Sequence, residues 1–148
     1  MDKYNLERFI KRQQEDYNLA YMEISRGRKE SHWMWWIFPQ IDGLGMSSTS
    51  RKYAIGSLEE AEAFLNHPYL GANLRNICEV LLGLPGKDPG KIFGSPDDLK
   101  LRSSMTLFAE AASGDDLFQR VLDKFYGGKK DELTLQLLKV RVRKRINR

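Results

Sequence analysis

The chain has 148 residues, a length that fits one domain with its own hydrophobic core. Its one cysteine excludes an internal disulfide, and no apolar stretch approaches the roughly 18 residues of a membrane span. The N-terminus lacks the apolar centre of a secretory signal, so we expect a cytoplasmic protein with no membrane association.

The basic residues are unevenly distributed. The formal net charge is +4, but six of the 24 lysines and arginines fall in residues 139–148, where there is no acid. The other 18 stand against 20 acidic residues, so the rest of the chain is close to neutral. We therefore divide the chain into a single helical domain, residues 1–138, and a basic tail, residues 139–148. The tail could bind phosphate groups, or it could be the solvated end of a helix, where cations complement the helix dipole.

The first predicted helix covers most of the N-terminal region. Apolar residues recur at helical spacing from Leu6 to Ile24. Asn5 can cap the start of this helix, and Gly27 can end it. The pattern stops there, so we expect one long first helix.

Residues 28–56 are the most unusual segment of the chain. They show little periodicity, and they contain all three tryptophans, Trp33, Trp35 and Trp36. Loops beyond about 12–15 residues are usually functional or disordered, and this one is too aromatic to be disordered. We expect a long aromatic loop whose rings either anchor the core or line a pocket, because a large ring gains by leaving water in both cases.

Two further helix starts follow the aromatic segment. Ser57 and Glu60 have the spacing of a capping box, and Pro68 stands at the first position of the next helix. The apolar face of that helix contains Cys78 and ends at Gly83. A cysteine in an apolar stripe is more often a packing residue than a reactive thiol.

The second half of the helical domain shows the same kinds of helix-start signal. Ser95 can act as an N-cap with Pro96 at the first helical position and acids in the first turn. Apolar periodicity then predicts helices over residues 117–125 and from near Asp131 into the tail. With no competing strand pattern, the sequence predicts an all-α, single-domain multihelical bundle of five to seven helices.

The spacing of the motif residues excludes several kinds of active site. The stretch from Gly86 to Ile92 is one residue short of a phosphate-binding loop and ends in isoleucine where the magnesium-binding hydroxyl belongs. Two histidines and one cysteine cannot form a standard zinc site, and HExxH, GxSxG and GxGxxG are all missing from the sequence. We expect no metal site and no cofactor.

Polar residues near the aromatic segment and near the Pro96 helix form the candidate site. Each has a structural explanation as well, since aspartates often cap helices and a histidine beside tryptophans is often a packing residue. If the two regions pack together, rings, an imidazole, a carboxylate and an ammonium would share a cleft that suits a planar base with a phosphate. The candidate catalytic residues are His32 and Asp97, and the candidate ligand-binding residues are Trp33, Trp35, Gln40, Lys100 and Ser103.

Distinctive strings occur throughout the body: SHWMW at 31–35, FPQ at 38–40, GLG at 43–45, HP at 67–68, FGSPDDLK at 93–100 and SSMTLF at 103–108. Over roughly residues 5–138 they closely resemble the uncharacterised family catalogued as domain of unknown function 1810. The resemblance implies a single-domain multihelical fold and no established activity, so no catalytic residue is carried over from it. A calpastatin label that circulates for the family finds no support in this compact sequence. The chain departs from the family pattern at Trp36 and Tyr126, where phenylalanine is commoner, and in the basic tail.

Two functions of different classes follow. The first is binding or processing of a small nucleotide-like or phosphorylated ligand in the aromatic and polar pocket. The alternative is a non-enzymatic interaction module that uses residues 139–148 to bind nucleic acid or an acidic protein. The sequence leaves open whether the protein is an enzyme, which ligand it binds and what its oligomeric state is.

Overall fold

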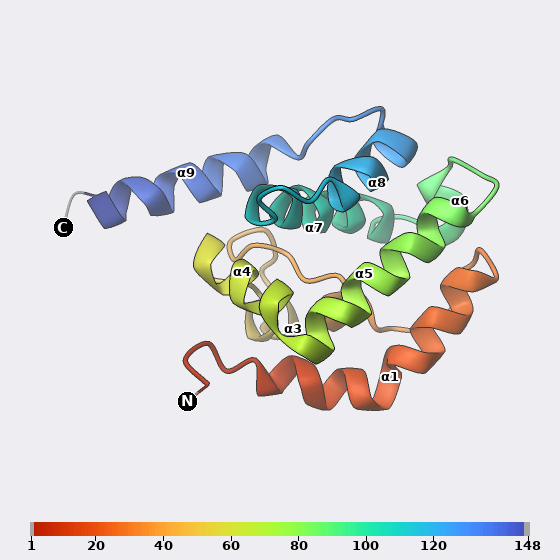
Figure 1. Cartoon of the computed structure of the whole chain (residues 1–148), viewed down its shortest axis with the longest axis horizontal. Coiled ribbons are helices and arrows are strands. Elements are labelled where there is room, and N and C mark those ends of the chain that lie inside the picture. The colour runs from red at the N-terminus through yellow and green to blue at the C-terminus, as the bar shows by residue number, and fades with distance from the viewer. Residues whose placement is uncertain (1, 147–148) are drawn as a thin grey trace.

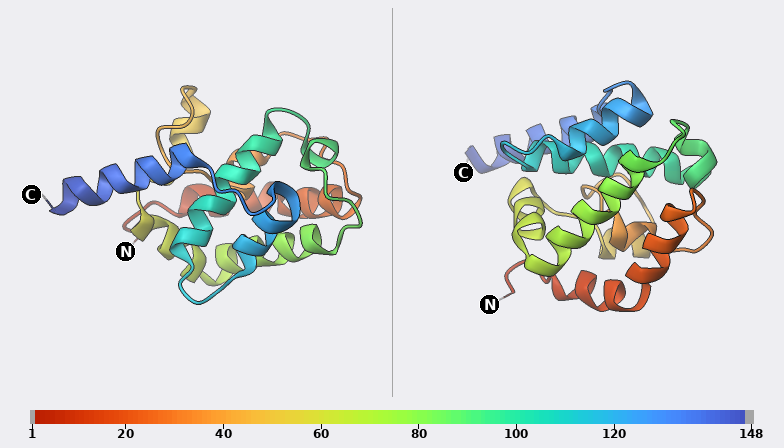
Figure 2. Two further views of the ribbon diagram at one scale, coloured as in Figure 1. Left: turned by 90° about the horizontal axis from the view of Figure 1, so that it is seen from above. Right: turned by 45° about the vertical axis from the view of Figure 1, so that its right-hand side comes forward.

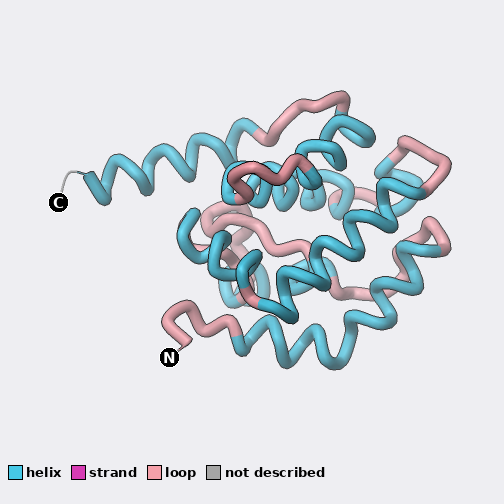
Figure 3. The backbone as a smooth tube through the Cα atoms, in the orientation of Figure 1, coloured by secondary structure: helices cyan, strands magenta, loops and turns pink. Residues whose placement is uncertain are grey.

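The computed structural model describes residues 2–146, with side chains through residue 141. The side chains of the basic tail from residue 142 onward, including Arg143, Lys144, Arg145 and Arg148, therefore lie outside the described residues. In the described range the chain is helical, with one isolated parallel bridge between Ile41 and Ile55 and no strand (Figure 3). The all-α prediction is confirmed. The helices are α1 (Glu7–Ser25), α2 (Met34–Ile37), α3 (Ser48–Lys52), α4 (Leu58–Asn66), α5 (Pro68–Gly83), α6 (Pro89–Phe93), α7 (Asp97–Ala111), α8 (Leu117–Tyr126) and α9 (Glu132–Ile146).

Helix α7 is the centre of the bundle. It packs against α4, α6, α8 and α9, while α5 packs against α1, α4 and α8 (Figure 1). An ordinary surface helix buries one face, but α7 buries Leu101, every residue from Ser103 to Phe108, and Ala111. Figure 2 shows α9 running along the bundle and then leaving it toward the C-terminus. None of the described helices has both the length and the apolar composition that a membrane span needs.

The helix starts at α4 and α5 follow their predicted caps. The hydroxyl of Ser57 accepts a hydrogen bond from the backbone N–H of Glu60 at the start of α4. At α5, Pro68 occupies the first turn, and Nδ1 of His67 accepts from the backbone N–H groups of the next turn. His67 is therefore a capping residue. Cys78 is buried in the core, as predicted.

Two residues that were predicted to cap helices do not do so. Asn5 does not cap α1, because the carboxylate of Asp2 reaches the first backbone N–H groups instead. Ser95 does not cap α7: the helix begins at Asp97, Pro96 is its N-cap residue, and no side-chain bond caps it. The acids still lie in the first turn of α7, where they complement the helix dipole.

The segment 28–56 contains more regular structure than its sequence predicts. Short helices α2 and α3 interrupt it, and α6 was also unexpected, so the described chain has more helices than the five to seven predicted. Each of the three has only four or five residues. A helix this short contains little more than one turn, so it has no repeating apolar pattern to detect.

Candidate functional site

The three tryptophans lie in three different environments. Trp33 is only 1% exposed, and its indole N–H donates to Oε1 of Glu23 at 2.9 Å. Trp36 is also buried, and its N–H donates to Asp16 at 2.9 Å. Trp35 is half-buried, and its N–H bonds to no residue that the structure describes. Trp33 and Trp36 are therefore core residues, and Trp35 is the ring that a ligand could reach.

Glu23 fixes the start of the aromatic segment. Its buried carboxylate accepts from the backbone N–H groups of Glu30 and Ser31, from the Ser31 hydroxyl and from the Trp33 indole. Burial by itself would raise the pKa of Glu23, but these four donors outweigh it and lower the pKa to about 2. Glu23 is thus an ionised structural residue at neutral pH.

The protein should lose stability in acid through Glu23. Its pKa falls from 4.5 in the unfolded chain to about 2 in the folded chain, so its contribution is complete above pH 4.5 and disappears as the pH falls toward 2. The full contribution is about 3 kcal/mol. Urea unfolding at several pH values should therefore show the gap between wild type and Glu23→Gln closing from pH 5 to pH 2.5. A gap that is constant over this range would contradict the prediction.

Asp97 connects the aromatic segment to α7 through two lysines. Its Oδ2 lies 2.8 Å from Nζ of Lys29, and its Oδ1 lies 3.1 Å from Nζ of Lys100. Nζ of Lys29 also donates to the carbonyl of Ser31 at 2.6 Å. Burial would raise the pKa of Asp97, but the hydrogen bonds from Lys29 and Lys100 lower it. Asp97 therefore holds two ammonium groups in place as a carboxylate.

Both lysines also lie on tryptophan rings. Nζ of Lys100 is 4.1 Å from the ring centre of Trp35, and Nζ of Lys29 is 4.9 Å from that of Trp33. These distances are within the range of cation–π attraction. We call Lys29, Trp35, Asp97 and Lys100 the lysine–tryptophan cluster. Lys29 keeps 7% of its side chain exposed and Lys100 keeps 24%, so Lys100 is the more accessible cation.

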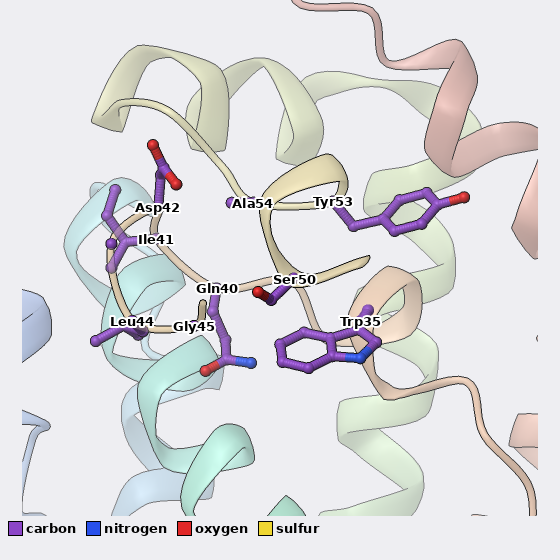
Figure 4. A pocket seen from close by; sticks show the side chains of 10 residues that line it. Trp35, Gln40, Ile41, Asp42, Leu44, Gly45, Ser50, Tyr53 and Ala54 are labelled. Carbon is purple, nitrogen blue, oxygen red and sulfur yellow. The ribbon is translucent and has the colours of Figure 1, made fainter. Parts of the chain in front are cut away.

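A small hollow lies beside Trp35 (Figure 4). Its volume is about 10 Å³, room for about one water molecule. Nε2 of Gln40 is buried without a hydrogen-bond partner among the described residues, and Figure 4 shows it pointing toward the Trp35 ring. A buried donor without an acceptor costs about 1–3 kcal/mol. The hollow therefore offers an unmet donor that a water or a ligand oxygen would satisfy. Its lining residues are Trp35, Gln40, Ile41, Asp42, Gly43, Leu44, Gly45, Ser50, Tyr53 and Ala54.

The structure brings together only part of the predicted site. Lys100 contacts both Asp97 and Trp35, and Gln40 lines the hollow beside Trp35. Trp33 lies in the core instead.

Two predicted site residues make no described hydrogen bond or ion pair with this group. His32 is exposed and makes no hydrogen bond or ion pair with any residue in the described range. Ser103 is buried, with its Oγ 3.1 Å from the Asp131 carboxylate and 3.2 Å from the carbonyl of Leu99.

Lys29 is the cluster residue that the sequence prediction missed. The only sequence signal for Lys29 is its position two residues before the string SHWMW. An ordinary solvated lysine fits that position equally well. Among the described residues there is no group of three histidines, cysteines or carboxylates that could hold a metal ion.

The fold and the cluster define a single-domain, all-α protein whose aromatic segment is joined to its central helix by a carboxylate and two lysines. The chain belongs to the family described as Protein of unknown function (DUF1810), whose sequence profile matches residues 3–138. It is also similar to the solved structure of the conserved hypothetical protein Rv1873 from Mycobacterium tuberculosis. The two chains are 45% identical with a TM-score of 0.90, over 93% of this chain and 98% of that one. The comparison with curated proteins finds no match.

Proposed function

We propose that the protein binds a small anionic ligand with a planar ring, such as a nucleotide, at Trp35 and Lys100. The observation that carries the proposal is the Lys100 ammonium on the ring of Trp35, which shares a hollow with Gln40, whose Nε2 has no partner among the described residues. The ring offers a stacking surface, the ammonium attracts a phosphate, and the amide donates to an oxygen. These are the three interactions that a nucleotide-like molecule needs.

The charge of the cluster favours an anion. Lys29 and Lys100 share the single carboxylate of Asp97, so the cluster has one positive charge in excess. Lys29 has its donors engaged by Asp97 and Ser31, and it lies against a core ring. Lys100 is therefore the cation that would turn toward a bound phosphate.

The arrangement supports binding more directly than catalysis. A carboxylate with a lowered pKa is a weak base, and two lysines already occupy Asp97. Proton transfer by His32 and Asp97, and ligand contacts from Ser103, stay as hypotheses. If the protein turns over its ligand, His32→Ala should abolish turnover while leaving affinity nearly unchanged.

Replacing Lys100 should weaken binding while leaving the fold intact. We expect adenosine monophosphate to bind more tightly than ribose 5-phosphate or inorganic phosphate, because only the nucleotide can stack on Trp35. Lys100→Met should weaken adenosine monophosphate binding by about 10-fold, since it removes the accessible cation. Isothermal titration calorimetry measures both effects.

Lys11→Met is the matched control, because Lys11 is an exposed lysine on α1. It should leave the affinity unchanged. Equal affinity of the Lys100→Met variant and wild type, or the lack of binding by all three compounds, would contradict the proposed function.

The alternative function makes a separate prediction. If the tail binds nucleic acid, a chain lacking residues 142–148 should lose a salt-sensitive affinity for a DNA duplex. Arg141, the last tail residue with a described side chain, contacts the body of the protein. No described contact favours the alternative.

A further inference from the structure

The hollow beside Trp35 is much smaller than the ligand that we propose for it. About one water fits in its roughly 10 Å³, so a planar ring can reach this side of Trp35 only if a neighbouring segment moves. Five of the lining residues fall between Asp42 and Ser50. Residues 43–51, which we call the flap, are therefore the segment whose movement would enlarge the hollow.

The two ends of the flap region are joined by a short bridge. Ile41 and Ile55 pair in parallel and are both buried in the core. The N–H of Asp42 donates to the carbonyl of Ile55, and the N–H of Ile55 donates to the carbonyl of Gln40, each at 2.8 Å. The base of the flap is thus fixed, and the chain between the paired residues forms a closed loop.

Arg141 of α9 binds both of the chain segments that this bridge joins. Its Nη2 donates to the carbonyl of Asp42 at 2.8 Å, and its Nη1 donates to the carbonyl of Gly56 at 2.5 Å. The Asp42 carboxylate lies 3.9 Å away. The guanidinium thus uses two N–H donors of its planar fork to bind two carbonyls at once.

A second residue of α9 lies against the start of the flap. A Cβ at Gly43 would lie 3.3 Å from the methyl groups of Leu137, and Gly43 has a φ of +107° that other residues rarely adopt. The start of the flap is therefore shaped to fit α9.

The flap has few polar contacts of its own with the body. Gly43, Leu44, Gly45 and Met46 have no polar side chains, and Met46 is 80% exposed. Beyond them, the hydroxyl of Ser47 caps α3 within the flap. The far end is tied to α1, where Arg8 donates to the carbonyls of residues 52 and 54. Among the described residues, no side-chain hydrogen bond or ion pair joins residues 43–51 to another helix.

We infer that Arg141 is a latch: by binding Asp42 and Gly56 it holds the flap closed over Trp35, and α9 thereby controls access to the ligand site. The inference rests on the proposed function for the identity of the ligand, but closure of the flap is independent of it. Releasing α9 lowers the free energy needed to open the hollow. A ligand that binds the open state then binds more tightly, because less of its binding energy is spent on opening.

The test compares Arg141→Met with Lys139→Met, a neighbouring exposed residue of α9. Amide hydrogen exchange by mass spectrometry should show residues 43–51 exchanging about 10-fold faster in Arg141→Met and unchanged in Lys139→Met. Arg141→Lys keeps the charge but lacks the fork, so it should behave like Arg141→Met. Adenosine monophosphate should bind the Arg141→Met variant about 3- to 10-fold more tightly than wild type.

The outcomes separate the two proposals. Unchanged exchange of residues 43–51 in both Arg141 variants overturns the latch, whether or not the nucleotide binds. Faster exchange without nucleotide binding to any variant supports the latch and contradicts the proposed function. If Arg141→Met exchanges faster in every helix, the exchange of the Arg141→Lys variant is the measurement that tests the latch. Unchanged exchange of residues 43–51 in Arg141→Lys then also overturns the latch.

Discussion

Replacing Glu23 by alanine is expected to lower the free energy of unfolding by about 3–5 kcal/mol, a large part of the stability of a domain of this size. The carboxylate accepts four hydrogen bonds in the interior, and alanine leaves every donor without an acceptor. Each unsatisfied buried donor costs about 1–3 kcal/mol, although water entering the space would recover part of it. Urea unfolding followed by circular dichroism measures the change.

The control for Glu23→Ala is Glu15→Ala. Glu15 lies on the exposed side of the same helix, and its one ion pair among the described residues is a 4.0 Å contact with Arg12. Its replacement should change stability by less than about 0.5 kcal/mol. A loss below about 1 kcal/mol for Glu23→Ala would show that the carboxylate does not organise the aromatic segment.

Gly71→Ala is expected to destabilise the protein by about 3 kcal/mol, because α5 crosses α4 at this glycine. A Cβ at Gly71 would lie 2.0 Å from the backbone carbonyl oxygen of Leu65, a distance that no side-chain rotation can relieve. The two helices would have to separate, which places the cost at the upper end for overpacked cores. Thermal unfolding of the variant measures it.

Gly83→Ala is the matched control for Gly71→Ala. Gly83 is the last residue of the same helix, and a Cβ there meets nothing within 4 Å. Alanine should be neutral or slightly stabilising at this position, because it favours helix more than glycine does. If Gly71→Ala were equally stabilising, the close crossing of α4 and α5 would be refuted.

The long helices could be predicted from the sequence because their signals are local. The capping box at Ser57, the proline at residue 68 and the regular apolar residues of α1 all act within one or two turns of the chain. The one-turn helices α2, α3 and α6 are too short for such signals. The start of α7 was misplaced by one residue, because Pro96 is its N-cap residue and not its first helical residue.

The sequence predicts which residue types form the candidate site, but it does not predict in which direction each side chain points. Trp33 and Trp35 are two positions apart at the start of α2, and residues two apart on a helical turn point in nearly opposite directions. One ring therefore enters the core while the other reaches the hollow. No sequence pattern distinguishes them, because the apolar periodicity of so short a helix is undefined.

The remaining contacts depend on distant parts of the chain. Arg141 and Asp42 are 99 positions apart in the sequence, and Lys29 and Asp97 are 68 positions apart. Only the packing of α9 and α7 brings them to the aromatic segment. The sequence shows the charges but does not show which of them are paired.

The most direct test of the ligand site is the response of the three indole N–H groups to adenosine monophosphate in a ¹H–¹⁵N spectrum, with the Trp35 signal assigned from a Trp35→Phe variant. Trp33 and Trp36 are buried and donate to the carboxylates of Glu23 and Asp16, so their signals should stay in place. The signal of Trp35 should shift progressively and saturate, and the shift should weaken in Lys100→Met. A Trp35 signal that does not move, or equal shifts of all three indoles, would contradict a ligand site at Trp35.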